Sequence, residues 1–348
     1  GLDLPVAVVE DPRAATPLVS ATVYGHPADH LTTMTVTGTN GKTTTTYLMR
    51  AALTVAHPDP ALCGTVETLV GDLHIRSVRT SNEAPVVERL LALAVEEDLG
   101  AAVVETSAHA LSLHRVDGIV FDVAGFTNLQ HDHLDYYGDM EHYYEAKRIL
   151  FTPAHSRCGV VCVDDEWGRR LAHEAEVPVV TVSALTDTPA DWTVRGIHPD
   201  TRTSRTVFTL VDPSGTAREV ACPIPGEVNV QNTVVAIVSA VALGLDVDRV
   251  IDAVQHAPQV PGRMEKVNDD ARVQPLVVVD YAHTPEGLEW TLRSIRELTG
   301  GRVVLVFGTD GDRDPSKRED VAETGARGAD VLWVTDENPR TEDAASIR

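Results

Sequence analysis

Short apolar runs alternate along the chain with longer stretches in which apolar residues recur at helical spacing. The runs are rich in Val, Leu and Thr and lie at 31–37, 101–104, 275–280, 302–307 and 330–335. Helical patterns follow them, one starting at Thr43, a short one after Glu105 and one near 285–298. Continuous apolar strands between helices are typical of parallel sheets that are covered on both faces. The sequence therefore predicts an α/β fold.

Residues 190–224 break this rhythm. Three segments there alternate apolar and polar residues and are separated by Asp-Pro and Ser-Gly turn signals, which predicts a small antiparallel sheet. A helix is expected at 231–243, and the Pro- and Gly-containing stretch 257–263 has the composition of a hinge. We therefore expect three parts: 1–30, which is too short for a domain, a central domain at 31–258, and a C-terminal domain at 259–348 whose sheet has few strands.

Charge narrows the classes of partner. The 348 residues include 29 Lys and Arg against 52 Asp and Glu, a net charge of −23. Such a chain repels nucleic acid and anionic membranes, so any anionic substrate has to be held by a few local cations, helix N-termini and metal ions. There is no apolar run of membrane-spanning length and no charged-then-apolar leader, and the four cysteines are scattered. We expect a cytoplasmic protein without nucleic-acid or membrane partners.

The sequence Gly38-Thr39-Asn40-Gly41-Lys42-Thr43 lies between an apolar strand and a helix. Glycines let backbone N–H groups turn inward, the helix N-terminus adds its positive end, and Lys42 suits the β- and γ-phosphates. The Thr43 hydroxyl suits Mg²⁺. A plain glycine-rich turn is the alternative, but strand, loop and helix in this order favour a nucleotide site.

Several longer motifs accompany this loop. They are Thr35–Thr45 (TVTGTNGKTTT), Glu105–His109 (ETSAH), Phe126–Asp135, Glu145-Ala146-Lys147, Asn229–Asn232, Pro261-Gly262-Arg263, Asp280–Pro285, Gly311–Asp314 and Asn338-Pro339-Arg340. In this order the motifs resemble those of the Mur ligases, with which folylpolyglutamate synthases share the loop, and the last two resemble the branch called MurE. The resemblance implies a P-loop central domain followed by a Rossmann-like domain. If the resemblance holds, we also expect 1–30 to be the remnant of an N-terminal domain that binds a UDP-linked substrate, and 259–348 to be an incomplete C-terminal domain.

The resemblance also implies a reaction. Mur ligases use ATP to turn a carboxylate into an acyl phosphate, which an amine then attacks, so catalysis is mainly alignment and charge neutralisation. Lys42 would neutralise phosphates, Thr43 and Glu105 would hold a first Mg²⁺, and His133 a second. Lys147 would react with CO₂ to give a carbamate that supports the second ion. Three of these residues also have a purely structural interpretation: Glu105 as a helix cap, His133 as an ordinary loop histidine and Lys147 as a surface lysine of its helix.

For ATP the resemblance adds residues beyond the loop. Asn229 and Asn232 would meet the adenine, although either could instead cap the following helix. Arg263 at the hinge would reach the phosphates on domain closure, and Asp280 and His283 would contact ribose or line the cleft. The full expected ATP set is Gly38, Thr39, Asn40, Gly41, Lys42, Thr43, Thr44, Asn229, Asn232, Arg263, Asp280 and His283.

The expected substrates are UDP-N-acetylmuramoyl-L-alanyl-D-glutamate and an amino acid, taken up by a monomer. By resemblance Thr80, Ser81, Ser107 and Arg115 hold the muramoyl dipeptide, although Arg115 could be a structural ion-pair partner. By the same resemblance Arg313, Asn338 and Arg340 recognise meso-diaminopimelate, whose extra carboxylate suits an arginine. The chain departs from the family pattern at Ala108, Asn82 and Glu337, and in Gly308–Asp314, where GTDGDRD replaces GCGGDRD.

Four alternatives stay open. A lysine-adding ligase of the same branch would share the mechanism. A folylpolyglutamate-type amide ligase would share the loop and the carbamate, but Arg313 and Asn-Pro-Arg argue against it. A non-catalytic ATP-binding scaffold would not need Lys42, Thr43, Glu105, His133 and Lys147 together. An ordinary P-loop NTPase would not explain Lys147 or the C-terminal motifs.

Overall fold

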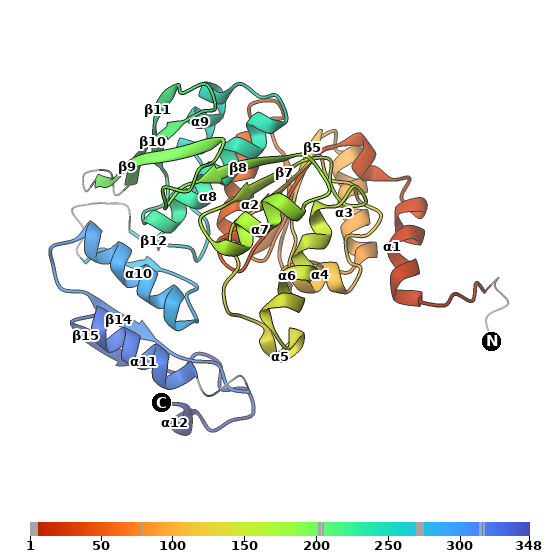
Figure 1. Cartoon of the computed structure of the whole chain (residues 1–348). Helices are drawn as coiled ribbons and strands as arrows, with labels where there is room; N and C mark the ends of the chain where they lie inside the picture. Colours follow the sequence, from red (N-terminus) through yellow and green to blue (C-terminus); the bar gives the residue numbers. More distant parts are fainter. Residues whose placement is uncertain are drawn as a thin grey trace. The chain divides into compact units, whose positions relative to one another are not determined.

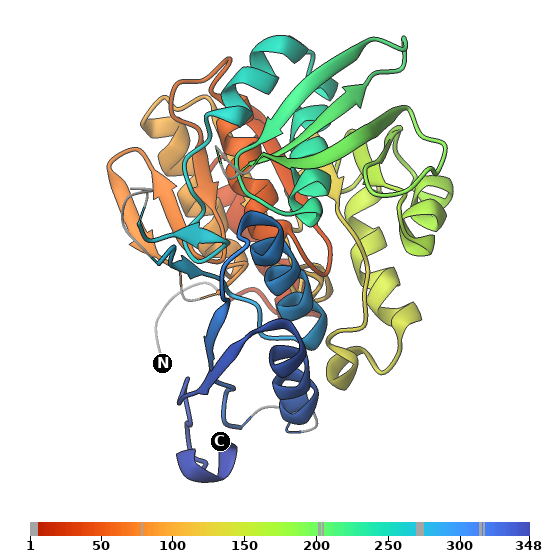
Figure 2. The ribbon, with the colours of Figure 1, turned by 90° about the vertical axis from the view of Figure 1, so that its left-hand side faces the viewer.

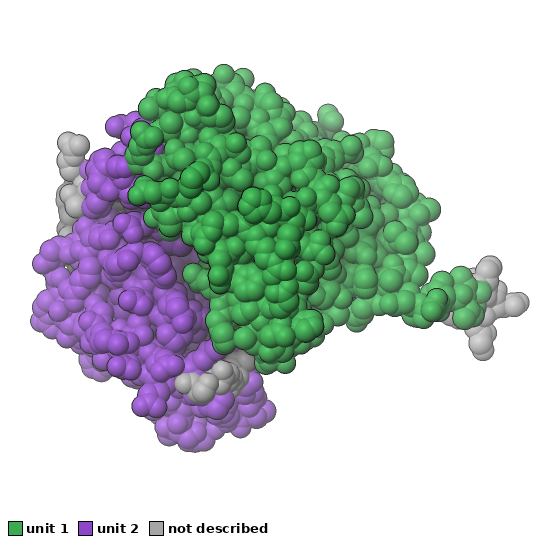
Figure 3. All heavy atoms as spheres, viewed as in Figure 1, with its two compact units in different colours: residues 1–195, 210–218, 231–257 green, residues 196–209, 219–230, 258–348 purple. Residues whose placement is uncertain are grey.

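The computed structural model describes residues 6–77, 79–200, 203, 205–268, 275–312, 315 and 317–348. The chain divides into two compact units, shown in Figure 3. Unit 1 comprises residues 1–195, 210–218 and 231–257, and unit 2 comprises residues 196–209, 219–230 and 258–348. Among the described residues, no helix combines the length and the apolar character needed to cross a membrane.

Figure 1 labels the elements. The helices are α1 (Pro12–Val23), η1 (Pro27–His30), α2 (Lys42–Leu53), α3 (Ala84–Glu96), α4 (Ala108–Ser112), α5 (Leu134–Tyr137), α6 (Met140–Arg148), η2 (Ile149–Phe151), α7 (Glu166–Glu174), α8 (Glu227–Ala242), α9 (Val247–Gln255), α10 (Pro285–Leu298), α11 (Lys317–Gly328) and α12 (Ala344–Ile347). The strands are β1 (Thr32–Thr37), β2 (Ala61–Cys63), β3 (Glu67–Val70), β4 (Leu73–Arg76), β5 (Ala101–Glu105), β6 (Val123–Phe126), β7 (Gly159–Cys162), β8 (Val179–Ser183), β9 (Trp192–Asp200), β10 (Arg205–Val211), β11 (Ala217–Cys222), β12 (Glu265–Lys266), β13 (Val278–Val279), β14 (Val304–Phe307) and β15 (Val331–Val334).

The large sheet confirms the α/β prediction. Within the described residues its strand order is β11-β10-β9-β8-β7-β6-β1-β5-β2-β3-β4. The central strands are parallel: β1 pairs with β5 and with β6, and β6, β7 and β8 follow in register. The alternating segments at 190–224 form β9, β10 and β11, and the parallel pair β8–β9 joins them to the main sheet.

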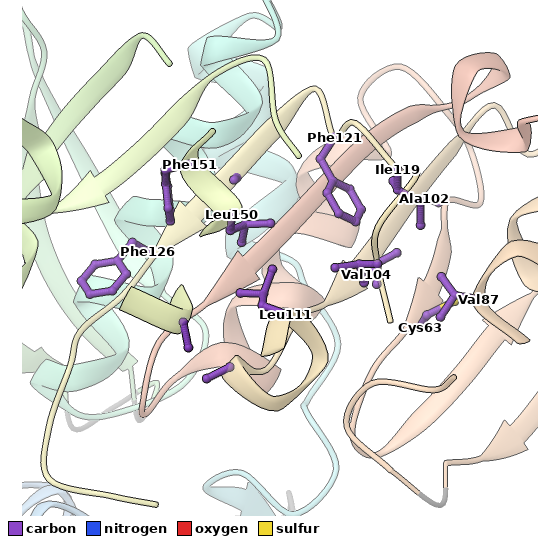
Figure 4. Close-up of a cluster of buried hydrophobic side chains, with 14 of the residues drawn as sticks. Cys63, Val87, Ala102, Val104, Leu111, Ile119, Phe121, Phe126, Leu150 and Phe151 are labelled. Carbon is purple, nitrogen blue, oxygen red and sulfur yellow. The ribbon is translucent and has the colours of Figure 1, made fainter. Parts of the chain in front are cut away.

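Apolar side chains cover both faces of the parallel strands. On one face, residues of β5, β6 and β7 pack against α3, α4, α6 and α7, and Figure 4 shows part of this cluster, including Val104, Leu111 and Phe126. On the other face α2 packs against β1 and β5. Gly125 in β6 leaves room there, because a side chain at this position would meet Met49 and Val235 at 3.0 and 3.1 Å. Continuous burial explains why β5, β6 and β7 lack polar alternation.

Unit 2 holds a smaller parallel pair. Strands β14 and β15 run in register from Val304↔Val331 to Phe307↔Val334. Helices α10 and α11 pack side by side next to this pair, as Figure 2 shows, with Leu288 and Val321 in their shared cluster. Helix α10 begins where Pro285 follows Thr284, whose side chain accepts a hydrogen bond from the Gly287 N–H.

One expected strand is wrong. We expect the run 275–280 to form a buried strand, but within it only Val278–Val279 (β13) forms a strand. Its described pairing is antiparallel, with β12, and Val277 and Val279 are exposed. A short apolar run does not determine which segment pairs with it, and here residues 265–266 supply the partner. The division expected at 258/259 stays a prediction.

Candidate active site

The phosphate loop lies at the carboxyl end of β1 and leads directly into α2. Lys42 folds back over the loop, and its Nζ donates to the carbonyl oxygens of Gly38 at 3.0 Å and of Thr39 at 2.8 Å. Gly41 precedes the helix with φ of +85°, a conformation in which glycine is unstrained. A side chain at Gly41 would also lie 2.1 Å from Oδ1 of Asn232. The loop therefore has the geometry of an anion cradle at a helix N-terminus.

The turn after β6, at Thr127 and Asn128, forms hydrogen bonds with this loop. The Asn40 N–H donates to Oδ1 of Asn128 at 2.9 Å, and the Thr39 N–H donates to the Asn128 carbonyl oxygen at 2.9 Å. Thr127 Oγ1 donates to the Asn40 carbonyl oxygen at 2.7 Å. A side chain at Gly38 would meet this hydroxyl at 2.0 Å. The position of the loop is therefore fixed by residues nearly ninety positions later in the chain.

Glu105 ends β5 beside Thr43, and its side chain is 1% exposed. Its Oε1 accepts hydrogen bonds from the hydroxyls of Thr43 at 3.0 Å and of Thr65 at 2.8 Å, and its Oε2 accepts from the Thr65 N–H at 2.8 Å. Helix α4 begins at Ala108, and Ser107 caps it, so Glu105 is not that cap. A buried carboxylate and a hydroxyl at the start of α2 thus face each other.

Lys147 is a fully buried lysine of unit 1. It lies on α6 and is 1% exposed, and its Nζ donates to the Gly38 carbonyl oxygen at 2.8 Å. The same Nζ lies 4.5 Å from the centre of the Tyr143 ring. Burial, with a further contribution from the Lys42 charge, holds the pKa of Lys147 well below its usual value. The surface-lysine alternative is therefore wrong, and burial favours the neutral form of this amine.

His133 lies in an aromatic group next to Lys147. Its ring packs edge-on against His109 at 5.0 Å and against Tyr143 at 6.0 Å between ring centroids. Its backbone is left-handed, with φ of +55°, a conformation uncommon for residues other than glycine. Burial lowers its pKa, although Asp132 opposes this shift. Among the described residues, no cluster of three or more His, Cys, Asp or Glu side chains forms a ready metal site.

Three of the four expected dipeptide residues lie together. Ser81 Oγ donates to the Glu105 carbonyl oxygen at 2.9 Å and accepts from the Ser107 N–H at 3.1 Å. Arg115 donates to the Ser81 carbonyl oxygen at 3.2 Å and forms an ion pair with Glu83 at 2.9 Å. Ser81 and Arg115 thus have structural partners, and their role with substrate stays a prediction. Thr80, the residue before Ser81 in the chain, is half-buried.

The expected adenine residues belong to different units. Asn232, in unit 1, accepts a hydrogen bond from Thr45 Oγ1 at 3.4 Å and lies against Gly41, so it contacts the phosphate loop. Asn229, in unit 2, donates to the Pro225 carbonyl oxygen at 2.8 Å. Both are buried, and their contact with adenine stays a prediction.

The remaining ATP candidates lie in unit 2. Asp280 accepts hydrogen bonds from the Met264 N–H at 2.8 Å and from Thr291 Oγ1 at 3.0 Å, which ties its loop to α10. Arg263 stacks over the Tyr281 ring at 4.2 Å, and His283 lies 5.0 Å from the same ring. These contacts place Arg263 and His283 on one aromatic side chain.

The loops expected to bind the amino acid follow β14 and β15. The Gly311 N–H donates to the Asn338 carbonyl oxygen at 2.8 Å, and the Arg340 N–H donates to Asn338 Oδ1 at 3.2 Å. Arg340 itself forms an ion pair with Asp310 at 3.0 Å. Burial raises the pKa of Glu337, and the nearby Asp310 raises it further. Arg313 lies outside the described residues.

Four contacts were not expected from the sequence. Thr65, Asn128, Tyr143 and Asp310 each touch an expected site residue. Thr65 and Tyr143 carry no local signal, because their contacts arise only from tertiary packing. Asp310 carried one: it stands where the related motif has glycine.

The comparisons with known proteins agree with this geometry. Residues 36–240 match the model of the Mur ligase middle domain, and residues 262–348 match that of the Mur ligase, glutamate ligase domain. The chain is 46% identical over 345 residues to the UDP-N-acetylmuramoyl-L-alanyl-D-glutamate--2,6-diaminopimelate ligase of Streptomyces coelicolor. It is 44% identical over 349 residues to the UDP-N-acetylmuramyl-tripeptide synthetase of Leifsonia xyli. Both alignments cover 99% of this chain and 67% of the relative.

Solved structures give the same result. A structure of UDP-N-acetylmuramoyl-L-alanyl-D-glutamate--2,6-diaminopimelate ligase matches with a TM-score of 0.74 at 29% identity, over 98% of this chain and 69% of the other. Folylpolyglutamate synthase of Mycobacterium tuberculosis, complexed with ADP, matches with a TM-score of 0.75 at 20% identity, over 97% of this chain and 81% of the other, and this likeness concerns the fold alone. With the phosphate loop, the Thr43–Glu105 pair and the buried Lys147 in one unit, the chain belongs to the Mur ligase family.

Proposed function

We propose that the protein ligates meso-diaminopimelate to UDP-N-acetylmuramoyl-L-alanyl-D-glutamate with consumption of ATP, in the synthesis of peptidoglycan precursors. One observation supports this most strongly: Lys42 and the buried Lys147 both donate to the carbonyl oxygen of Gly38, beside the Thr43–Glu105 pair. A simple nucleotide hydrolase has no need of a second, desolvated lysine at this point. The names of the Streptomyces and Leifsonia relatives supply the substrate class.

The reaction needs two displacements. A carboxylate oxygen of the D-glutamyl residue attacks the γ-phosphorus of ATP, a P–O bond forms, and ADP leaves with the electrons of the broken bond. The amine of the amino acid then attacks the acyl carbon, loses a proton and expels inorganic phosphate. Both steps bring negative groups together, so the loop N–H groups and Lys42 lower the barrier by neutralising the phosphates.

The described residues fit one Mg²⁺ on the nucleotide. Mg²⁺ prefers oxygen ligands and is bound through a few side chains together with substrate phosphates, and Glu105 and Thr43 present a carboxylate and a hydroxyl 3.0 Å apart. These two residues would hold the ion, which would supply charge neutralisation at the phosphates. On binding of the ion, the Thr43 hydroxyl would turn from Glu105 Oε1 to the cation.

Lys147 fits a CO₂-derived carbamate. Only a neutral amine attacks CO₂, and burial keeps this amine neutral more readily than an exposed one. A bond forms between Nζ and the carbon of CO₂, a proton leaves the nitrogen, and the neutral amine becomes an anionic carbamate. The new carboxylate oxygens, with His133, would hold a second Mg²⁺, a role that no cluster of acidic side chains takes among the described residues.

The proposal is tested by product formation. The intact gene product is incubated with ATP, Mg²⁺ and UDP-N-acetylmuramoyl-L-alanyl-D-glutamate, and the tripeptide product and ADP are measured with meso-diaminopimelate or L-lysine. We expect turnover that requires diaminopimelate. Turnover with lysine alone would keep the ligase mechanism and refute the choice of amino acid. ATP binding without ligation of either amino acid would refute the proposed activity.

A further inference from the structure

Asp310 and Arg340 form an ion pair across two loops of unit 2. The loop after β14 carries Asp310, the loop after β15 carries Arg340, and the guanidinium Nη2 lies 3.0 Å from Asp310 Oδ2. Because β14 and β15 are parallel and in register, their carboxyl ends bring these loops to one edge. Both side chains are about one-third exposed, so the pair is open to a ligand in solution.

The pair is held by the backbones of both loops. The Gly311 N–H donates to the Asn338 carbonyl oxygen, and the loops approach so closely that a side chain at Gly311 would lie 2.0 Å from the Pro339 carbonyl oxygen. The Thr341 hydroxyl donates to Asp312 at 2.7 Å. Asp310, the residue before Gly311, is therefore fixed opposite Arg340.

Arg340 is held in an uncommon conformation. Its φ is +50°, a left-handed value that is unfavourable for a long side chain and that persists where surrounding contacts impose it. Here the Asn338 side chain accepts from the Arg340 N–H. Strained residues of this kind cluster at active sites and ligand-binding sites. The same loop edge carries a second left-handed residue, Asp312, with φ of +54°.

The pair presents both signs of charge at one place. A guanidinium has five N–H donors in a planar fork, and the contact with Asp310 occupies one of the terminal nitrogens of Arg340. Its other donors suit a carboxylate. Asp310, with Glu337 near it, suits an ammonium group. The arrangement is complementary to a carbon atom that bears an ammonium and a carboxylate together.

We propose that Asp310 is a specificity-determining residue, which together with Arg340 recognises an amino acid whose distal carbon is zwitterionic. This inference rests on the proposed function and deepens it. Diaminopimelate has such a distal carbon, lysine has only an ammonium there, and 2-aminopimelate has only a carboxylate. Asp310 stands where the motif that this loop resembles, GCGGDRD, has glycine.

The test compares three amino acids in the ligation assay. KM and kcat for meso-diaminopimelate, L-lysine and L-2-aminopimelate are measured with the wild type and with Asp310→Asn, which keeps the shape of the side chain and removes its charge. Asp310→Gly, which restores the glycine of the motif, serves as a second variant. The matched control is Asp330→Asn, because Asp330 pairs with Arg296 at 2.8 Å with similar exposure but lies before β15, at the opposite end of the strand.

We expect both Asp310 variants to raise KM for diaminopimelate about three- to tenfold, the usual effect of losing one partly exposed charged contact. KM for 2-aminopimelate and for ATP should stay the same. The preference of the enzyme for diaminopimelate over 2-aminopimelate, measured as the ratio of their KM values, should therefore decrease. Asp330→Asn should change none of these values. An equal rise for both pimelates would show that Asp310 only supports the loop, and a fall in KM for diaminopimelate would show that it masks Arg340; either result overturns the inference. Absence of ligation by the wild type with all three amino acids would instead contradict the proposed function and the inference together.

Discussion

Glu88 is a buried carboxyl group whose ionisation should weaken the fold at neutral and higher pH. It lies on α3, which packs against α1, η1 and strands β2, β3 and β5, and it is 1% exposed. Neither of its carboxyl oxygens has a hydrogen-bond partner among the described residues. Burial, with a contribution from the Asp29 charge on η1, raises the pKa of Glu88 from its usual 4.5 to about 7.

The magnitude follows from this pKa. Because the folded pKa lies above the unfolded one, the folded chain binds the proton more tightly, and stability is lost as pH rises from about 4.5 through about 7. The full difference of about 2.5 pH units corresponds to about 3.4 kcal/mol, of which about 2 kcal/mol falls between pH 5.5 and pH 8. In Glu88→Gln this contribution is absent, since the amide does not ionise. The variant should therefore gain stability relative to the wild type as pH rises.

The assay is urea unfolding of both proteins at about pH 5.5 and pH 8. Trp167 and Trp192 lie in unit 1, and replacing Trp290 and Trp333 of unit 2 by Phe makes the fluorescence signal report unit 1. We expect the free energy of unfolding of the wild type, minus that of Glu88→Gln, to fall by about 2 kcal/mol between the two pH values. Glu96→Gln, at an exposed position of the same helix, should show no such change. A difference that is constant with pH would refute the reasoning, because it would mean that Glu88 does not change its protonation over this range.

Three further predictions concern the active site. Gly41→Ala should weaken ATP binding more than tenfold, measured by calorimetry, because the added side chain would lie 2.1 Å from Asn232. Gly244→Ala is the control, since Gly244 has a similar φ of +87° and open space around it. This control should cost only about 1 kcal/mol of stability and leave ATP binding intact. Lys147→Met should abolish ligation while keeping or raising the melting temperature, since it removes a desolvated amine; a destabilised protein would show that Lys147 is mainly structural. Glu105→Gln should lower kcat about a hundredfold and raise the Mg²⁺ concentration needed for half-maximal rate, and an unchanged Mg²⁺ titration would contradict the assigned ligand role.

Local signals in the sequence were sufficient for several elements. Helix α10 was expected at 285–298 and spans Pro285–Leu298, because Thr284 and Pro285 form a strong N-terminal signal and the apolar spacing continues to its end. The phosphate loop was likewise evident, since its glycines, lysine and flanking elements are contiguous in the chain. Residues 275–280 were misread because strand pairing depends on a segment elsewhere, which an apolar run does not reveal.

The contacts of the site that could not be predicted from the sequence depend on tertiary structure. Tyr143 lies one helical turn before Lys147 on α6, and its ring also contacts His133, which precedes α5. The three side chains come together only when α5 packs against α6. Ser81 was expected to face substrate, whereas it also joins the ends of two segments through Glu105 and Ser107. Asp310 was visible as a departure from a motif, but its meaning depends on Arg340 lying 3.0 Å away on another loop.

The central claim is that this chain activates a carboxylate by phosphorylation. It is tested most directly by labelling the γ-carboxylate of the D-glutamyl residue with ¹⁸O, running the ligation with ATP and diaminopimelate, and analysing the phosphate by mass spectrometry. We expect one ¹⁸O atom in inorganic phosphate for each amide formed, because the carboxylate oxygen that attacks the γ-phosphorus leaves with it. Unlabelled phosphate, or label in AMP, would contradict it.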